Sequence, residues 1–216
     1  MKLKGKKVVF LGDSITEGTG TSCEAARFTC LLEKNAGLAP IKNYSIGGTR
    51  IARQQHIDPQ HFIWDTNSFA ERFHKMDNEA DIVVVFGGTN DFDHGDAPFG
   101  TDDDRTMDTY CGALHYLMQG LIEKYPMATI CFLTPLHRRG ENVPNASNKL
   151  LFKPYVDQIK KTAQLYSLPV LDLYANAGIQ PAIQAQKELF IPDGLHPNDL
   201  GNQRIAERLQ AFLEAL

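Results

Sequence analysis

Residues 81–91 read Asp-Ile-Val-Val-Val-Phe-Gly-Gly-Thr-Asn-Asp and carry the strongest structural signal in the chain. The first six, Asp81–Phe86, form an almost unbroken apolar run that two glycines end. Such a run is typical of a strand buried on both faces of a parallel sheet. The polar residues Thr89 to Asp91 would then lie at the carboxyl edge of that sheet, where open α/β folds bind their ligands.

Strand-like and helix-like segments alternate on both sides of this run. Further strands are expected at Lys7–Leu11, Ile41–Ile46, Thr129–Leu133 and Leu168–Leu171. Helices are expected over 22–36, with Ser22 as cap, and over 68–76, 106–124, 150–166 and from Pro197 onward. This alternation predicts an α/β fold, a flavodoxin-like three-layer α/β/α sandwich with a five-stranded parallel sheet. No linker or internal repeat divides the chain, so we expect residues 1–216 to form a single domain.

Length and composition are those of an ordinary globular domain. The chain has 216 residues, of which 43% are hydrophobic and 22% charged, and a chain of this length buries roughly 70% of its unfolded surface. A net charge of −4 argues against a nucleic-acid partner. No apolar run approaches the ~18 residues of a membrane span, and Val8–Leu11 is too short for the core of a signal peptide. We therefore expect a cytoplasmic protein without nucleic-acid or membrane partners.

The cysteine pattern indicates neither a metal site nor a disulfide framework. Cys23, Cys30, Cys111 and Cys131 form no C-x-x-C pair and have no histidine at zinc spacing. We interpret them as free, mostly buried thiols of a reducing compartment, with Cys23 and Cys30 spaced to share a helix face. The segment 91–96 lacks the glutamate and spacing of a calcium loop, and nucleotide-binding motifs are missing. We expect no metal and no cofactor.

Four polar clusters follow predicted strands or precede the last helix. Ser14 follows the first strand at a strand-to-helix turn, a typical position for an exposed nucleophile. Gly47-Gly48 follows the second strand and leaves backbone N–H groups open to a ligand, and Asn90 follows the third with its side-chain amide. Asp193 precedes His196 by three residues, so its carboxylate can accept the Nδ1 proton and leave Nε2 free as a base.

Each cluster alone also has an ordinary structural explanation. Ser14 can cap the next turn, and the two glycines can supply a positive-φ turn. Asn90 can close an Asx turn, and His196 can simply precede a helix. Together, however, the four supply a nucleophile, a base, an orienting carboxylate and oxyanion donors, which are the parts of an acyl-transfer site. Their joint occurrence favours catalysis.

In order along the chain, these clusters resemble the sequence blocks of the SGNH hydrolases, also called the GDSL lipase/esterase family. The matching blocks are Gly12-Asp13-Ser14, Gly48 in the Asn43 segment, Gly88-Thr89-Asn90-Asp91 and Asp193-Gly-Leu-His196. The resemblance runs from residue 7 to the final helix. It implies that Ser14 is the nucleophile, His196 the base and Asp193 the residue that orients it.

The same resemblance implies oxyanion donors at the N–H groups of Ser14 and Gly48 and at the side chain of Asn90. Two departures from the family pattern occur. The first block reads Gly-Asp-Ser-Ile instead of Gly-Asp-Ser-Leu, a conservative apolar change. Gly47 stands where the family often has serine or another small residue, which leaves Gly47 as the alternative to Gly48.

The function that the resemblance implies is a metal-independent serine ester hydrolase acting through an acyl-enzyme. The sequence contains no apolar lid segment of the kind that would suggest long acyl chains. The polar loops favour acetylated carbohydrate as the substrate, with lysophospholipid or thioester substrates as alternatives. The partner is then a small-molecule ester; the oligomeric state is open, with a homodimer as one option. A non-catalytic α/β ligand-binding domain is the rival from another class. A phosphoreceiver is disfavoured because Asp172-Leu-Tyr stands where that fold needs a lysine.

Three charged or aromatic loop segments are open to more than one interpretation. A long loop that could shape the substrate mouth contains His56, His61 and Trp64, with Arg50 and Arg53 nearby. Arg50 and His56 could contact a polar substrate there, and a surface role fits both at least as well. The segment 137–139 is interpreted as a solvated basic loop. The acidic run 102–104 is expected to cap the following helix.

Overall fold

The computed structural model describes all 216 residues and contains one parallel sheet. Its strands are β1 (Val8–Gly12), β2 (Lys42–Asn43), β3 (Ile82–Phe86), β4 (Thr129–Leu133) and β5 (Val170–Leu171). They are arranged in the order β2-β1-β3-β4-β5, and every neighbouring pair is parallel. The predicted α/β fold with a five-stranded parallel sheet is confirmed, and the strand order is that of flavodoxin-like folds.

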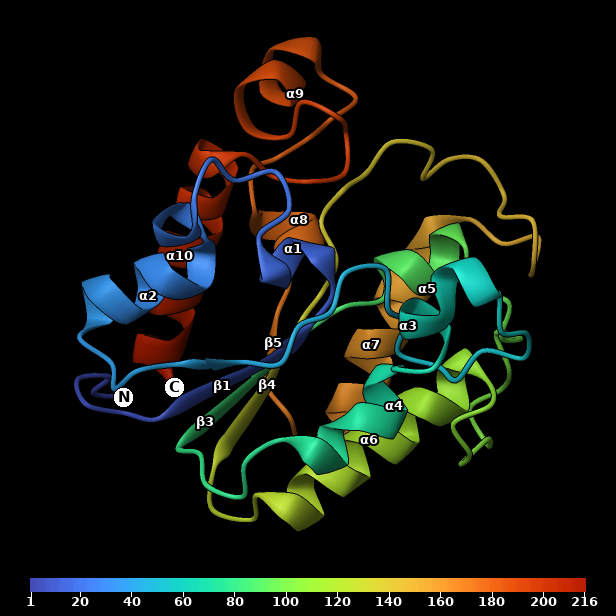
Figure 1. Cartoon of the computed structure of the whole chain (residues 1–216), viewed down its shortest axis with the longest axis horizontal. Coiled ribbons are helices and arrows are strands. Elements are labelled where there is room, and N and C mark those ends of the chain that lie inside the picture. Colours follow the sequence, from blue (N-terminus) through green and yellow to red (C-terminus); the bar gives the residue numbers. More distant parts are fainter.

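Helices cover both faces of the sheet, as Figure 1 shows. One face carries α2 (Phe28–Ala36) and α10 (Asp199–Ala215), and the other carries α4 (Phe69–Arg72), α6 (Tyr110–Lys124) and α7 (Phe152–Leu165). Shorter helices occupy the connections: α1 (Ser14–Glu17), α3 (Phe62–Asp65), α5 (Thr89–Asp93), α8 (Leu173–Asn176) and α9 (Gln184–Phe190). Single 3₁₀ turns are η1 (Glu24–Ala26), η2 (Pro59–His61) and η3 (Phe73–Lys75). None of these helices combines the length and the apolar character needed to cross a membrane.

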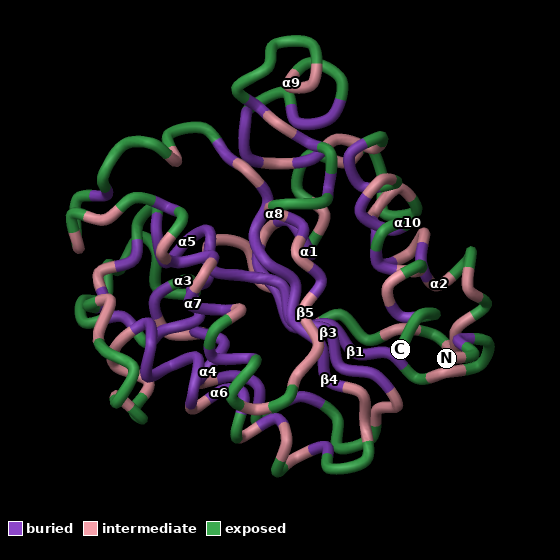
Figure 2. Tube along the Cα trace, turned by 180° about the vertical axis from the view of Figure 1, so that it is seen from behind, coloured by how far each residue is buried: buried purple, intermediate pink, exposed green.

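The two layers of helices enclose two separate cores because side chains alternate across the sheet. In β1, Val9 and Leu11 join the core beneath α6 and α7, whereas Val8 and Phe10 join the core beneath α2 and α10. Every residue of β1 and β3 is buried, which Figure 2 shows as a continuous purple centre. The apolar run 82–86 is therefore covered on both faces.

The carboxyl ends of β1 and β3 form the point where the strand order changes direction. β1 lies between β2 and β3, and Gly12 at its end is paired in register with Phe86 at the end of β3. The chain continues from β1 into α1 at Ser14, and from β3 through Gly88 into α5. Gly88 has φ of +107°, a left-handed conformation that only glycine adopts readily. The sheet thus brings the segments that carry Ser14 and Asn90 to one edge.

The helix expected over 22–36 begins later than predicted. α2 starts at Phe28, and Ser22 is not its cap: the Ser22 N–H and hydroxyl donate to the Asp199 carboxylate at the start of α10. Ser22 does not cap the helix because it binds a residue 177 positions away in the sequence. Local sequence patterns do not reveal such a contact. Cys23 therefore lies outside α2 and does not share a helix face with Cys30.

The cysteine interpretation is confirmed in one respect and wrong in another. All four thiols are free, as expected, but Cys23 is exposed and Cys30 half-buried, so only Cys111 and Cys131 are buried. Burial raises the pKa of both buried thiols to about 12.

Two other boundaries differ from the prediction for local reasons. β2 spans two exposed residues rather than six because it lies at the sheet edge, and the next residues pair with β1 irregularly, with Ile46 N–H donating to the Gly12 carbonyl at 3.2 Å. The helix expected from 106 begins at Tyr110. Its cap is Thr109, whose hydroxyl accepts the Gly112 N–H, so the acidic run 102–104 does not cap it.

Candidate active site

Ser14 and His196 meet at the carboxyl edge of the sheet although 182 residues separate them. Ser14 Oγ lies 3.0 Å from His196 Nε2, and His196 Nδ1 lies 2.7 Å from Asp193 Oδ2. The second oxygen of Asp193 accepts the N–H groups of Leu195 at 2.8 Å and His196 at 2.7 Å. With its Nδ1 proton donated to the carboxylate, a neutral imidazole presents Nε2 as an acceptor to the serine hydroxyl.

The Asp193 carboxylate is held in its ionised form. Burial opposes ionisation, but the hydrogen bonds from His196 and from the Leu195 N–H outweigh burial and keep the pKa of this carboxyl below its usual value. The group is therefore negative at neutral pH. A negative charge at this position stabilises positive charge on the adjoining imidazole ring.

Ser14 owes its position to a short, capped turn. It is the first residue of α1, whose leading N–H groups have no acceptor within the helix. Asp13 caps the turn, because its carboxylate accepts the Ile15 N–H at 3.0 Å. The turn ends at Gly18, whose φ is +104°. The side chain of Ser14 is thereby presented at the sheet edge, with its own N–H facing no acceptor of the helix.

The two glycines after β2 differ in what their N–H groups do. Gly47 N–H donates to Glu17 Oε2 at 3.0 Å, whereas Gly48 N–H has no acceptor within the protein. Gly48 has φ of +73°, so the chain turns there. Glu17 was not identified from the sequence; the available signal is its position three residues after Ser14, on the same helical face.

Asn90 and Asp91 tie the start of α5 to the glycine segment. Asn90 Nδ2 donates to the Thr49 carbonyl at 3.0 Å, which leaves the second hydrogen of this amide without a partner. Asp91 accepts the N–H groups of Ile51 at 2.9 Å and of Ala52 at 3.0 Å. Burial raises the pKa of Asp91 to about 6, against the effect of those hydrogen bonds.

A buried cation, Arg72, lies behind the nucleophile turn. Its guanidinium donates to the backbone carbonyls of Gly12, Tyr44 and Asn67, and thereby joins β1 to the two segments beside it. Burial lowers the pKa of Arg72 to about 9 and raises the pKa of Asp13 to about 7. Sequence patterns contain no signal for this role, because all three acceptors are backbone groups of other segments.

Ser14 opens into a cleft of about 570 Å³. Four of the five predicted site residues line it, and Asp193 lies behind His196. The sequence-predicted residues are therefore brought together at one place. The lining residues are Ser14, Glu17, Thr19, Ile46, Gly47, Gly48, Ile63, Trp64, Asn90, Asp93, His94, Leu195 and His196.

Comparison with known protein families decides the relationship of this chain. Residues 10–204 match the model of the GDSL-like Lipase/Acylhydrolase family. The chain belongs to this family. The predicted membership is confirmed, and it makes the chain a hydrolase whose substrate is a small-molecule ester.

Solved structures share the fold of this acylhydrolase over nearly its whole length. A protein from Lactobacillus plantarum is 29% identical, with a TM-score of 0.85 over 99% of this chain and 98% of its own. A Bacteroides uniformis protein described as a GDSL-like lipase is 20% identical, with a TM-score of 0.72 over 98% and 97%. An acetyl xylan esterase, AlAXEase, is 20% identical, with a TM-score of 0.60 over 95% and 98%. No curated protein matches the chain.

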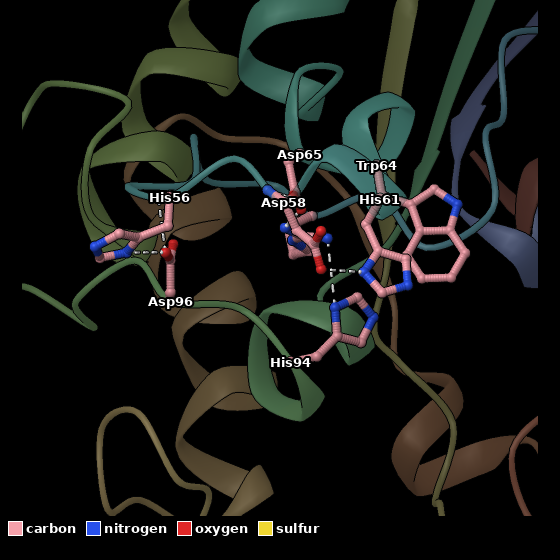
Figure 3. A pocket seen from close by; sticks show the side chains of 8 residues that line it. His56, Asp58, His61, Trp64, Asp65, His94 and Asp96 are labelled. Carbon is pink, nitrogen blue, oxygen red and sulfur yellow. Dashed lines mark hydrogen bonds and ion pairs between the residues drawn. The ribbon is translucent and has the colours of Figure 1, made fainter.

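A second cavity, of about 440 Å³, adjoins the cleft of this acylhydrolase and is drawn in Figure 3. Trp64 and His94 line both cavities and so lie between them. The remaining walls of the second cavity are polar: Arg50, His56, Asp58, His61, Asp65 and Asp96. No group of three or more His, Cys, Asp or Glu side chains in the structure is arranged to hold a metal ion.

Two arginines of the acylhydrolase are buried where the sequence favoured or allowed exposure. Arg50 is 3% exposed, pairs with Asp65 and donates to the Gly48 carbonyl at 3.0 Å. Arg138 is also buried: it donates to the Thr89 carbonyl and hydroxyl at 3.0 Å, so 137–139 is not simply a solvated loop. Both cations hold backbone next to predicted site residues.

Proposed function

We propose that this chain is a serine esterase in which Ser14, His196 and Asp193 act as a catalytic triad. The single observation that carries the proposal is the unbroken series of contacts from hydroxyl through imidazole to carboxylate, at 3.0 and 2.7 Å. Those distances allow proton transfer between positioned groups. The free Gly48 N–H beside this series supports an oxyanion site at the same place.

In the acylation step, Ser14 Oγ attacks the ester carbonyl carbon while its proton passes to His196 Nε2. The carbonyl oxygen becomes negative and accepts hydrogen bonds from the Ser14 N–H, the Gly48 N–H and the Asn90 amide. Asp193 stabilises the imidazolium. The bond to the leaving oxygen then breaks, His196 returns the proton to that oxygen, and the alcohol departs from the acylated serine.

Deacylation repeats these steps with water as the attacking group. His196 Nε2 accepts a proton from water, whose oxygen adds to the acyl carbon and regenerates the same oxyanion. Collapse of this intermediate breaks the bond to Ser14 Oγ, which takes the proton back from His196. A carboxylic acid is released, and the enzyme returns to its starting protonation state.

Short-acyl esters of polar alcohols, such as acetylated carbohydrates, are the proposed substrates. The cleft walls near Ser14 and His196 include the polar side chains of Glu17 and Thr19, which suit a hydroxylated alcohol. A structure with the same fold, AlAXEase, is an acetyl xylan esterase, which supports this substrate class.

A fluorophosphonate probe tests the reaction class, because it phosphonylates the hydroxyl of an activated serine: an O–P bond forms and the P–F bond breaks with release of fluoride. We expect covalent labelling of the wild type, none of Ser14→Ala and strongly reduced labelling of His196→Ala. Ser167→Ala, which removes the hydroxyl of an exposed serine outside the cleft, is the matched control and should label like the wild type. A wild-type chain that does not label contradicts the proposal and favours a non-catalytic binding domain.

A substrate panel tests the proposed alcohol. We expect higher kcat/KM for acetylated oligosaccharides than for a lysophospholipid or an acyl thioester presented at the same concentration. A higher kcat/KM for the lysophospholipid or the thioester, in an enzyme that labels at Ser14, would contradict the proposed substrate class but not the esterase mechanism.

A further inference from the structure

The single tryptophan of the chain, Trp64, stacks on a histidine ring and also approaches the glycine with the free N–H. The ring centroids of His61 and Trp64 are 4.5 Å apart, with 14° between their planes. The indole also lies so close to Gly48 that a Cβ added there would overlap its ring atoms. Trp64 thus contacts both His61 and Gly48, and the residue, 38% exposed, lines both cavities.

A closed ring of contacts fixes this stack in place. The Gly48 carbonyl accepts from Arg50 at 3.0 Å, and Arg50 pairs with buried Asp65. Asp65 Oδ2 accepts the Asp58 N–H at 2.8 Å, and Asp58 Oδ2 lies 3.0 Å from His61 Nδ1. His61 stacks on Trp64, and Trp64 in turn contacts Gly48, which closes the ring. In Figure 3 the His61 and Trp64 rings lie one against the other beside the cavity. Trp64 is therefore held as a fixed wall.

The proposed reaction sets the direction in which an acyl chain must run. The leaving oxygen lies at His196 Nε2, because that nitrogen returns the proton to it. The carbonyl oxygen points at the Gly48 and Asn90 donors. The remaining substituent of the carbonyl carbon is the acyl chain, which projects away from His196. Trp64 lines the cleft against the oxyanion donor Gly48, and His94 lines it next to Trp64.

We propose that Trp64 determines the acyl length that this enzyme accepts, an inference that rests on the proposed esterase function. Trp64 lines both the 570 Å³ cleft and the 440 Å³ cavity, and in this proposal its indole is the wall that an acyl chain meets. With Trp64 in place the enzyme takes acetyl and similarly short groups. A smaller side chain at position 64 joins the two spaces and admits longer chains.

The polarity of the second cavity limits the acyl length that the Trp64→Ala variant can accept. Its walls carry Asp58, Asp65 and Asp96, and a long alkyl chain would lie against carboxylates and histidines. The joined space therefore suits chains of intermediate length. We therefore expect Trp64→Ala to raise kcat/KM, relative to acetate, for butanoyl and hexanoyl esters but not for decanoyl esters.

The test is the acyl-chain profile of p-nitrophenyl esters with Trp64→Ala. The leaving group is the same throughout, so ratios of kcat/KM between acyl lengths cancel any general loss caused by a disturbed Gly48. The indole would clash with a longer acyl chain, and a single methylene that clashes or fits changes kcat/KM by about tenfold or more. We therefore expect the hexanoate-to-acetate ratio to rise about tenfold or more in Trp64→Ala, and by less in Trp64→Phe, which keeps a smaller ring.

Phe62→Ala is the matched control. Phe62 lies in the same short helix α3 and is 57% exposed, but it lines neither cavity. Its removal should leave the hexanoate-to-acetate ratio within about twofold of the wild type, since the acyl wall is intact. Equal shifts in the Phe62 and Trp64 variants would assign the effect to loosening of α3 and overturn the proposal.

The outcomes separate this inference from the proposed function. If wild type and Trp64→Ala both label with the fluorophosphonate but share one acyl profile, Trp64 does not set acyl length and the inference is wrong, while the esterase function stands. If the wild type does not label, the esterase function fails and the inference fails with it.

Discussion

Asn90 uses one of its two amide hydrogens on the Thr49 carbonyl and has the other available for the cleft. Removal of one oxyanion donor costs about 10²–10³ in kcat, so we expect Asn90→Ala to lose about that much turnover. KM for a short p-nitrophenyl ester should change far less, because the donor acts on charge that develops in the transition state. Steady-state kinetics measures both, and a variant with wild-type turnover would contradict the assignment.

Glu17 is the residue that decides which glycine N–H is free, because it occupies the N–H of Gly47. Loss of a hydrogen bond to a charged group corresponds to about 1.5–3 kcal/mol. We therefore expect Glu17→Ala to reduce kcat by about tenfold or more as the glycine turn loosens, and Glu17→Gln, which still accepts, to restore most of it. Glu24→Gln, which touches only the exposed Arg27 pair, is the control and should retain full kcat.

Three of the site residues that sequence could anticipate follow a strand, namely Ser14, Gly48 and Asn90, whereas Asp193 and His196 precede the last helix. Ser14 and Asn90 come after the paired strands β1 and β3, so the strand order alone predicts that they lie close together. Arg50, Arg72 and Arg138 could not be anticipated. Arg72 and Arg138 donate to backbone carbonyls of other segments, and Arg50 pairs with Asp65, 15 residues away. Local sequence does not indicate such contacts, and arginine is ordinarily exposed.

At the scale of elements, the short helix α3 is attached to the rest of the molecule by the buried pair of Asp65 and Arg50. Removing one partner of a buried ion pair leaves the other uncompensated and costs about 3–5 kcal/mol. We expect Asp65→Asn to lower the free energy of unfolding by about that amount in urea denaturation.

The matched control for this pair is Asp108→Asn. Asp108 pairs with Arg53, but both side chains are about half exposed, at 50% and 46%. Exposed pairs contribute about 1 kcal/mol or less, so this variant should stay near the wild type. Equal losses of unfolding free energy in the two variants would show that the buried pair stabilises the fold no more than the exposed pair does.

Helix and strand positions followed from sequence where packing and local pattern agree. The strand Thr129–Leu133 was predicted with the bounds that the structure shows, because a short apolar run between two helices fits no structure other than a buried strand. The helix at 22–36 was predicted six residues too long, because Ser22 bonds to α10 rather than to its own turn. Such tertiary hydrogen bonds are invisible to periodicity.

For the whole molecule, two buried carboxyls make stability depend on pH. Burial raises the pKa of Asp13 to about 7 and of Asp91 to about 6, from a usual value of 3.8. Between about pH 4 and 7 the folded state binds protons that the unfolded chain has lost, so these groups reduce stability as pH rises. The expected change is on the order of a few kcal/mol.

The comparison of wild type with Asp13→Asn isolates this effect. Asparagine can still accept the Ile15 N–H but does not titrate. The difference in unfolding free energy, wild type minus variant, should fall as pH rises from about 4 to 7, measured by denaturation at several pH values. His94, whose pKa burial and Arg50 lower, acts in the opposite direction but cancels in the difference.

The stacked position of Trp64 also gives the enzyme an intrinsic optical signal. The chain contains one tryptophan among 216 residues, so all indole emission comes from the wall between the two cavities. A ligand that enters the cleft displaces water from the edge of this ring, and the emission maximum should shift to shorter wavelength. Titration of Ser14→Ala with an uncleaved ester would then report binding directly, without any attached label.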